Sequence, residues 1–280
     1  MLCFPNTKIN LGLYVTNRRD DGYHDLETVF YPLSPATASD PYLPLRDVLE
    51  IVPANETRLN LSGLSVEGDM YNNLVWKAYQ LMSGEFPGKI PPLDIYLHKV
   101  IPMGAGLGGG SADGSFMLQL INDYCSLGLT KDALASYALR LGSDCPIFIY
   151  NTPMFARGRG EQMTSIDISL ATYSLQLICP RVHVSTSSAF SLLAPRPAPF
   201  DLRTLQTLPV KQWKASISND FEKPVFDQYP VLADIKQQLY AQGAIFASMS
   251  GTGSTIYGIF KKSEKAVVKV DILFDEFYLA

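Results

Sequence analysis

The clearest alternation of hydrophobic and polar positions flanks a run of glycines in the first half of the chain. Before the glycines, Leu93, Ile95 and Leu97 alternate with polar residues, and this period of two predicts a half-buried strand. After them, apolar residues recur at helical spacing from Ser111 to about Tyr124, which predicts an amphipathic helix. The chain is therefore expected to run from a strand through a glycine loop into a helix.

The same two periods predict the other elements of the chain. Strands are expected at residues 3–16, 28–33, 47–52, 57–64, 172–179, 244–248 and 255–260, and in the apolar run after Pro146. Further helices are expected at residues 72–82, 130–141, 187–193, 230–242 and 263–275. A connection that contains Pro35, Pro41 and Pro44 joins two strands, and residues 156–161 are expected to form a glycine hairpin.

The glycine loop itself predicts a ligand. Five glycines fall between Gly104 and Gly110, and each ordered glycine costs roughly 0.5–1 kcal/mol more than alanine, so folding alone gives no reason for such a loop. A ligand that needs bare backbone N–H groups does give one. The first-turn amides of a helix point at such a ligand, and the helix end carries a charge of roughly +0.5. The pattern therefore predicts a phosphate-binding loop.

Other interpretations of the loop fit the residues less well. A flexible linker is also rich in glycine, but apolar residues flank this loop instead of Ser, Glu and Lys. The glycines match the G-x-G-x-x-G pattern of dinucleotide-binding folds, yet the acidic residue at the expected distance, Asp123, falls inside the helical pattern. The Walker pattern is absent because no Gly-Lys-Ser/Thr closes the loop. A phosphate cradle of another kind remains.

Composition excludes several classes of protein. The chain has 280 residues, 47% of them hydrophobic and 18% charged, which is typical of a globular protein long enough for two cores. Its 23 basic and 27 acidic side chains give a formal net charge of −4, which disfavours a nucleic-acid partner. No apolar run is long enough for a membrane span, and the first residues do not resemble a signal peptide. The four cysteines show no C-x-x-C spacing, which favours reduced thiols and a cytoplasmic location.

Three stretches place polar side chains where chemistry could use them. A turn with Asp-Gly chemistry presents Tyr23 beside His24. Asp144 lies between a glycine turn and a proline, where a carboxylate either caps a helix end or belongs to a site that tunes its pKa. Lys8 lies on the first predicted strand, where a lysine is usually a solvated edge residue. On the residues alone, a structural role remains open for each of them.

Residues 102–113 resemble the P-x-x-x-G-L-G-x-S-S/A loop of the GHMP small-molecule kinases. Further segments are similar to that family in the same order along the chain, at residues 8–11, 142–146, 156–161, 219–222 and 247–255. The last of these resembles a small-residue turn that packs against the phosphate loop. The resemblance implies an α+β, two-domain GHMP kinase fold. Its parts would be a ribosomal S5 domain 2-like N-terminal domain at residues 1–152 and a ferredoxin-like α/β C-terminal domain at residues 153–280.

The resemblance also implies roles for individual residues. Asp144 would be the catalytic base, and Lys8 would keep its carboxylate ionised and orient the attacking hydroxyl. ATP, with Mg²⁺ bridging its phosphates, would be bound by Lys99, Pro102, Met103, Gly104, Ala105, Gly106, Leu107, Gly108, Gly109, Gly110 and Ser111. The alcohol substrate would be bound by Asn10, Tyr23, His24, Asp144, Thr186 and Phe190. No separate metal-binding cluster is expected.

The turn at residues 18–24 reads R-R-D-D-G-Y-H and is similar to one branch of the family. That branch phosphorylates the 2-hydroxyl of 4-diphosphocytidyl-2-C-methyl-D-erythritol in the non-mevalonate isoprenoid pathway. The resemblance implies that Tyr23 and Phe190 stack on opposite faces of cytosine and that His24 bonds the edge of the base. Three alternatives remain: a sister kinase for mevalonate-type or homoserine-type alcohols, a nucleotide-binding module without catalysis, and a hydride-transferring enzyme.

Overall fold

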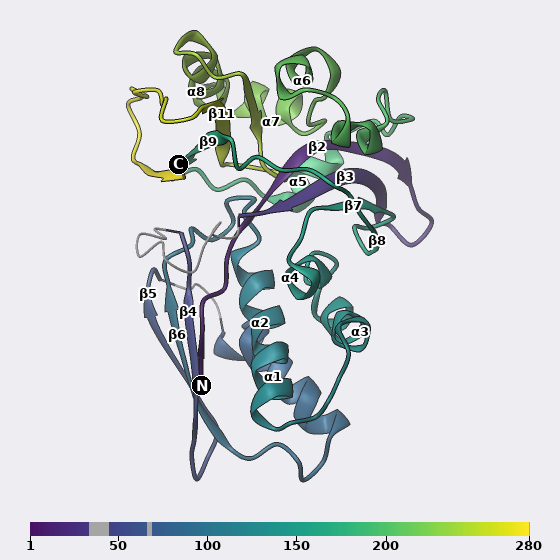
Figure 1. Ribbon diagram of the computed structural model, residues 1–280, viewed down its shortest axis with the longest axis vertical. Coiled ribbons are helices and arrows are strands. Elements are labelled where there is room, and N and C mark those ends of the chain that lie inside the picture. Colours follow the sequence, from purple (N-terminus) through teal and green to yellow (C-terminus); the bar gives the residue numbers. More distant parts are fainter. Residues whose placement is uncertain (34–44, 66–68, 280) are drawn as a thin grey trace. The chain divides into compact units, whose positions relative to one another are not determined.

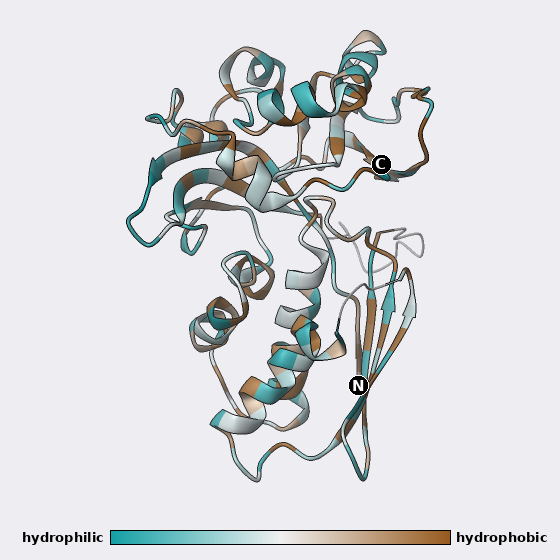
Figure 2. Ribbon diagram, turned by 180° about the vertical axis from the view of Figure 1, so that it is seen from behind, coloured by the Kyte–Doolittle hydropathy of each residue, from teal (hydrophilic) through white to brown (hydrophobic). Residues whose placement is uncertain are grey.

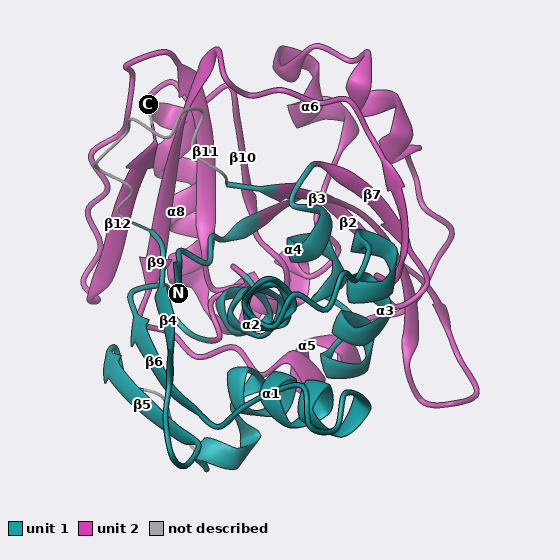
Figure 3. Ribbon diagram, turned by 60° about the horizontal axis from the view of Figure 1, so that its bottom comes forward, with its two compact units in different colours: residues 1–8, 32–103, 108–152 teal, residues 9–31, 104–107, 153–280 magenta. Residues whose placement is uncertain are grey.

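A computed structural model of the chain describes residues 1–33, 45–65 and 69–279 (Figure 1). The predicted connection with Pro35, Pro41 and Pro44 lies outside these residues. Hydrophobic stretches recur along both the helices and the strands (Figure 2). The chain divides into two compact units, of which the first comprises residues 1–8, 32–103 and 108–152 and the second residues 9–31, 104–107 and 153–280 (Figure 3). The domain boundary predicted between residues 152 and 153 stays a prediction.

The first unit contains a sheet with helices packed on one face. Its strand order is β1-β4-β6-β5, where β1 is Leu2–Cys3, β4 is Val48–Pro53, β5 is Arg58–Gly63 and β6 is Leu93–Lys99. The helices are η1 (Met70–Asn72), α1 (Leu74–Glu85), α2 (Gly109–Tyr124), α3 (Lys131–Leu141) and α4 (Pro146–Tyr150). Strand residues such as Ile51 and Ile95 are fully buried in one cluster with Met82 of α1 and Met117 of α2. Burial of alternate strand positions therefore confirms the period of two in this sheet.

Local sequence fixes the ends of the helices in this unit. The Asn73 side chain accepts a hydrogen bond from the N–H of Val75 at 2.9 Å, so α1 begins at residue 74, slightly later than predicted. The Thr130 side chain accepts one from the N–H of Ala133 at 3.2 Å, so α3 begins where its capping residue predicts. Both helices then bury the residues that recur at helical spacing.

The second unit contains two four-stranded sheets. One has the order β2-β3-β7-β8, with β2 at Lys8–Arg18, β3 at His24–Pro32, β7 at Met154–Arg157 and β8 at Gln162–Ser165. The other has the order β10-β11-β9-β12, with β9 at Tyr173–Pro180, β10 at Phe246–Met249, β11 at Ile256–Lys261 and β12 at Phe274–Leu279. The helices are α5 (Thr186–Ser191), η2 (Leu202–Gln206), α6 (Val210–Ser216), α7 (Glu222–Gln228) and α8 (Pro230–Ala241). The predicted glycine hairpin is confirmed as the β7–β8 turn.

Two predicted elements are wrong. The apolar run after Pro146 is the short helix α4, not a strand. Pro146 is its first residue, where the fixed φ of proline favours a helix start, and a short apolar run does not separate a buried strand from a buried helix. Its Ile147, Phe148 and Ile149 are all buried.

The helix predicted at residues 263–275 is also wrong, because residues 264–270 form neither helix nor strand. Buried Ala266 and Val268 alternate with Val267, which is 64% exposed, so the segment has the period of an extended chain. Three glutamine side chains replace a neighbouring strand: each donates to the carbonyl and accepts from the N–H of one residue. The pairs, at 2.8–3.0 Å, are Gln176 with Ala266, Gln242 with Val267 and Gln238 with Lys269.

These glutamines should differ in their contribution to stability. Gln176 is fully buried, so Gln176→Leu leaves the N–H and C=O of Ala266 unpaired away from water and should lower the free energy of unfolding by about 1–3 kcal/mol. The matched control is Gln242→Leu, because its partner Val267 is exposed and water can replace the lost bonds. Urea unfolding compares the two variants, and equal losses would contradict this account of the segment.

Candidate active site

The glycine loop connects β6 to α2, which confirms the predicted succession of strand, loop and helix. Gly104, Gly106 and Gly108 have φ angles of 64°, 77° and 74°, in the left-handed region that favours glycine. Gly108 is the capping residue of α2, and no side chain of the described residues caps this 16-residue helix. The first-turn N–H groups of α2 are therefore of the kind that binds an anion.

The small-residue turn at residues 250–255 packs against the loop, as predicted. The Ser250 hydroxyl donates to the carbonyl of Gly106 at 2.8 Å, and the N–H of Thr255 donates to the carbonyl of Ala105 at 3.2 Å. A Cβ on Gly106 would lie 2.0 Å from the Ser250 carbonyl oxygen. Close approach of the two backbones therefore requires glycine at position 106.

The three glycines at the start of α2 differ in their surroundings. A Cβ on Gly108 would lie 2.9 Å from Cζ of Phe148, and one on Gly109 would lie 2.8 Å from Cγ2 of Ile101. Packing therefore explains both of these glycines. A Cβ on Gly110 would meet no heavy atom of the described residues within 4 Å. Gly110 is the one of the three that protein packing does not explain.

Lys8 and Asp144, predicted as a catalytic pair, lie together in the first unit. Lys8 begins β2, and Asp144 lies in the turn between α3 and α4. Lys8 Nζ is 3.6 Å from Asp144 Oδ2, and the side chains are 3% and 40% exposed. Burial lowers the pKa of Lys8, while the charge of Asp144 opposes that shift. A Cβ on Gly108 would lie 3.3 Å from Lys8 Cε, so the pair adjoins the start of α2.

Lys99, predicted to bind ATP, lies in a buried cluster of charges. It is 2% exposed, and its Nζ pairs with Asp47 and, at 2.6 Å, with Asp113 of α2. Asp47 also accepts the N–H groups of Val100 and Ile101, at 2.6 and 3.0 Å, where the loop leaves β6. The cluster therefore ties the entrance of the loop to the first turns of α2.

The carboxyl of Asp113 gives this cluster a pH dependence. Burial raises the pKa of Asp113 well above its ordinary value, with Lys99 opposing and Asp47 reinforcing the shift. The folded chain then keeps a proton that the unfolded chain has released, so the free energy of unfolding falls as pH rises from about 4 through the raised pKa. Asp113→Asn should remove that loss and gain stability relative to the parent between about pH 5 and about pH 8. Urea unfolding of both proteins at the two pH values measures this gain. The same change in the free energy of unfolding with pH in both proteins would contradict the prediction.

The residues predicted to bind the alcohol substrate, other than Asp144, lie in the second unit. The rings of His24 and Phe190 stack on each other, with centroids 5.0 Å apart and an interplanar angle of 23°. Asn10 is 2% exposed and donates to the Thr28 hydroxyl at 2.9 Å. Tyr23 is 54% exposed.

Two members of this group touch segments beyond it. Phe190 packs edge-on against Phe221 at 4.8 Å. The hydroxyl of Thr186, the first residue of α5, lies 3.4 Å from that of Thr252 in the turn that packs on the loop.

Sequence reasoning missed several residues that support the site. Asp47 and Asp113 are buried acids, and the signal for Asp113 was an aspartate among the apolar positions of the predicted α2. Arg159 covers the ring of Tyr23, which no local pattern shows. In the described ranges, no group of three His, Cys, Asp or Glu side chains is placed to hold a metal ion. None of the helices in those ranges is long and apolar enough to cross a bilayer.

Two family models match the chain: the N-terminal domain of the GHMP kinases at residues 73–152 and their C-terminal domain at residues 210–278. The 4-diphosphocytidyl-2-C-methyl-D-erythritol kinase of Bacteroides fragilis is 49% identical over 275 residues, which cover 97% of this chain and 96% of that protein. The chain belongs to the GHMP kinase family. It is an ATP-using kinase with the mixed α+β, two-domain fold of this family, which confirms the predicted fold.

Two solved kinase structures resemble the chain over most of its length. A crystal structure of 4-(cytidine 5'-diphospho)-2C-methyl-D-erythritol kinase matches with a TM-score of 0.76 and 29% identity, covering 92% of this chain and 90% of that one. The homoserine kinase of Cytophaga hutchinsonii matches with a TM-score of 0.69 and 17% identity, covering 100% of this chain and 93% of that one. The second likeness shows the shared fold alone.

Proposed function

We propose that this GHMP kinase transfers the γ-phosphoryl group of ATP to the 2-hydroxyl of 4-diphosphocytidyl-2-C-methyl-D-erythritol, a step of the non-mevalonate isoprenoid pathway. The observation that carries the chemistry is the pair of Lys8 and Asp144 beside Gly108 at the start of α2. The choice of substrate is supported by the Bacteroides fragilis relative, whose name states it. The free thiols of Cys145 and Cys179 fit a cytoplasmic location.

The loop would hold the phosphates of ATP. Its positive φ angles at Gly104, Gly106 and Gly108 give a backbone that L side chains rarely adopt. The start of α2 adds a partial positive charge and free N–H groups, which together bind phosphate anions. Lys99 would support the loop from the protein interior, because its Nζ pairs with Asp47 and Asp113.

Asp144 would be the base. Its carboxylate takes the proton of the 2-hydroxyl, the oxygen forms a bond to the γ-phosphorus, and the bond from that phosphorus to the bridging oxygen breaks to release ADP. Lys8, whose Nζ lies 3.6 Å from Oδ2, would orient the carboxylate and the attacking hydroxyl. Most of the catalysis would come from positioning and from neutralising charge on the phosphates.

ATP would enter as its Mg²⁺ complex. Mg²⁺ keeps several water ligands and binds mainly to phosphate oxygens, so it needs few protein ligands. The Ser111 hydroxyl on the first turn of α2 and the 40% exposed carboxylate of Asp144 are oxygen donors of the type that it accepts. Mg²⁺ would neutralise charge as the phosphoryl group transfers.

The cytidine end of the substrate would bind in the second unit. Tyr23 offers an exposed aromatic face to a base, and Phe190 lies within ring contact of His24. The Thr186 hydroxyl and the Asn10 amide would supply polar contacts. Stacking accepts any base, so selection of cytosine would depend on hydrogen bonds to its edge.

One assay tests the proposal. The purified chain with MgATP is given 4-diphosphocytidyl-2-C-methyl-D-erythritol, homoserine or mevalonate, and ADP release and the phosphorylated product are measured. We expect turnover with the first compound alone and competitive inhibition by CDP. Turnover of homoserine or mevalonate without inhibition by CDP would assign the chain to a sister kinase instead. ATP binding without turnover of any of the three would contradict the proposal.

A further inference from the structure

Arg159 lies over the ring of Tyr23. It belongs to the turn between β7 and β8, and its guanidinium carbon is 4.1 Å from the centroid of the Tyr23 ring. That distance is well within the range of a cation–π interaction. A guanidinium is flat, so it can cover a ring face in the way that another ring does.

Both partners are held by hydrogen bonds of their own backbone. The N–H of Arg159 donates to Glu161 Oε2 at 2.5 Å, and the N–H of Leu26 on β3 donates to the carbonyl of Gly158 at 2.7 Å. These two bonds fix the Arg159 turn and attach it to the strand that follows Tyr23.

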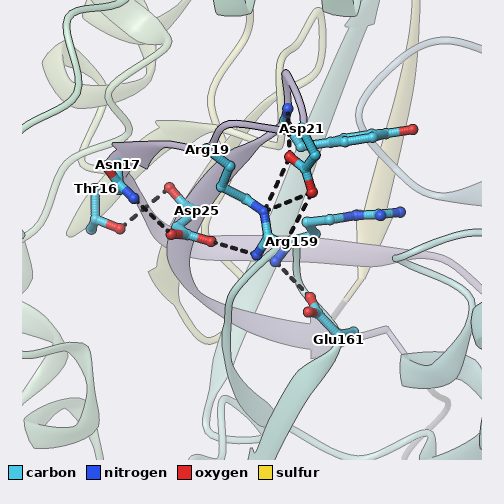
Figure 4. Close-up of polar contacts among 8 residues, drawn as sticks. Thr16, Asn17, Arg19, Asp21, Asp25, Arg159 and Glu161 are labelled. Atoms are coloured by element: carbon cyan, nitrogen blue, oxygen red, sulfur yellow. Dashed lines mark hydrogen bonds and ion pairs between the residues drawn. The ribbon is translucent and has the colours of Figure 1, made fainter.

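The Tyr23 turn is fixed in the same manner. The N–H of Tyr23 donates to Asp21 Oδ1 at 3.1 Å, and the Arg19 guanidinium holds that carboxylate at 3.1–3.2 Å and reaches Asp25 at 3.2 Å. Figure 4 shows Arg19, Asp21, Arg159 and Glu161 gathered at this point of the sheet. The two turns that carry the ring and the guanidinium are therefore held in place by bonds within the protein.

We propose that Arg159 is a positioning residue for the cytidine base, covering one face of Tyr23 so that the base stacks on the other. The inference rests on the proposed function. Tyr23 as a residue is 54% exposed, so it retains open surface for a base although a guanidinium lies over its ring. The cation draws electron density from the phenol ring and restricts its rotation, and both effects favour one stacked arrangement of guanidinium, phenol and base. Selection of cytosine over other bases still depends on hydrogen bonds to the edge of the base, whereas Arg159 contributes affinity.

The test is Arg159→Ala, measured by steady-state kinetics. We expect the KM for 4-diphosphocytidyl-2-C-methyl-D-erythritol and the Kd for CDP to rise about two- to five-fold, as loss of an exposed cation–π contact predicts. The kcat and the KM for ATP should stay unchanged, which a general loss of structure would not produce. For Arg159→Lys, this KM and the Kd for CDP should lie between those of the parent chain and those of Arg159→Ala, because lysine keeps the charge and loses the flat surface. The matched control is Arg157→Ala, an exposed arginine two residues earlier in the same hairpin, which should change neither constant.

A double-mutant cycle with Tyr23→Leu separates the stacking from other effects of the arginine. In that background Arg159→Ala should have no further effect on the Kd for CDP, because the ring that it covers is gone. The same loss in both backgrounds would overturn the inference, as would tighter CDP binding by Arg159→Ala, which would mean that the guanidinium blocks the base. A parent chain that turns the substrate over while Arg159→Ala keeps its KM contradicts this inference alone. A parent chain without turnover contradicts the proposed function and this inference together.

Discussion

Asp144→Asn is expected to lower kcat by roughly 10²–10⁴-fold while ATP binds nearly as before, because a positioned general base contributes about that much. Asparagine keeps the shape of the side chain and accepts hydrogen bonds, but it cannot take the proton of the attacking hydroxyl. The phosphates would be held by main-chain N–H groups of the loop, which the substitution leaves in place. Lys8, 3% exposed, loses the anion that opposes its burial, so its pKa should fall further.

Two measurements check this prediction. Single-turnover kinetics give the rate of phosphoryl transfer, and isothermal titration with a non-hydrolysable ATP analogue gives the nucleotide affinity. Asp123→Asn, at an exposed position near the end of α2, is the matched control and should leave both unchanged. If Asp144→Asn transfers phosphate at the parental rate, Asp144 has no part in the mechanism.

Gly106→Ala is expected to disrupt the loop and to weaken ATP binding strongly. Its Cβ would lie 2.0 Å from the carbonyl oxygen of Ser250 and 3.2 Å from that of Gly253, so two backbone segments would have to separate. Alanine at a φ of 77° adds strain of about 1–3 kcal/mol. The free energy of unfolding and the ATP affinity should therefore both fall, as urea unfolding and calorimetric titration would measure.

Gly110→Ala provides the contrast that separates strain from ligand binding. No heavy atom of the described residues lies within 4 Å of the added Cβ, and α2 gains a better helix former, so the free chain should gain about 0.5–1 kcal/mol of stability. ATP should nevertheless bind more weakly, because the methyl group takes space that a phosphate would use to approach the backbone. A variant that gains stability and keeps full ATP affinity would show that no phosphate approaches the backbone at residue 110.

Hydrophobic periodicity predicted most of the helices and strands. It failed where contacts with distant parts of the chain, and not the local sequence, determine the backbone conformation. The alternation of Leu93, Ile95 and Leu97 is a direct consequence of a sheet with one covered face, so β6 was predictable. The segment at residues 264–270 was not, because its backbone partners are glutamine side chains from distant parts of the chain. No pattern within the segment itself reveals such partners.

The candidate site was predictable to a similar degree. The glycine loop followed from the cost of ordering its residues, but the pairing of Lys8 with Asp144 came from resemblance and needed the fold to bring residues 136 positions apart to 3.6 Å. The cover of Arg159 over Tyr23 joins two turns of one sheet, and the charges around Lys99 come from a loop, a strand and a helix. These last two contacts depend on tertiary structure, so the sequence alone indicated Tyr23 without Arg159, and Lys99 without Asp47 and Asp113.

The central claim is that main-chain N–H groups at the start of α2 hold the phosphates of ATP. A crystal structure with a non-hydrolysable ATP analogue and Mg²⁺ tests it most directly. We expect phosphate oxygens within hydrogen-bond distance of the N–H groups of Gly108, Gly109, Gly110 and Ser111. Nucleotide density elsewhere, with those N–H groups facing solvent, would contradict it.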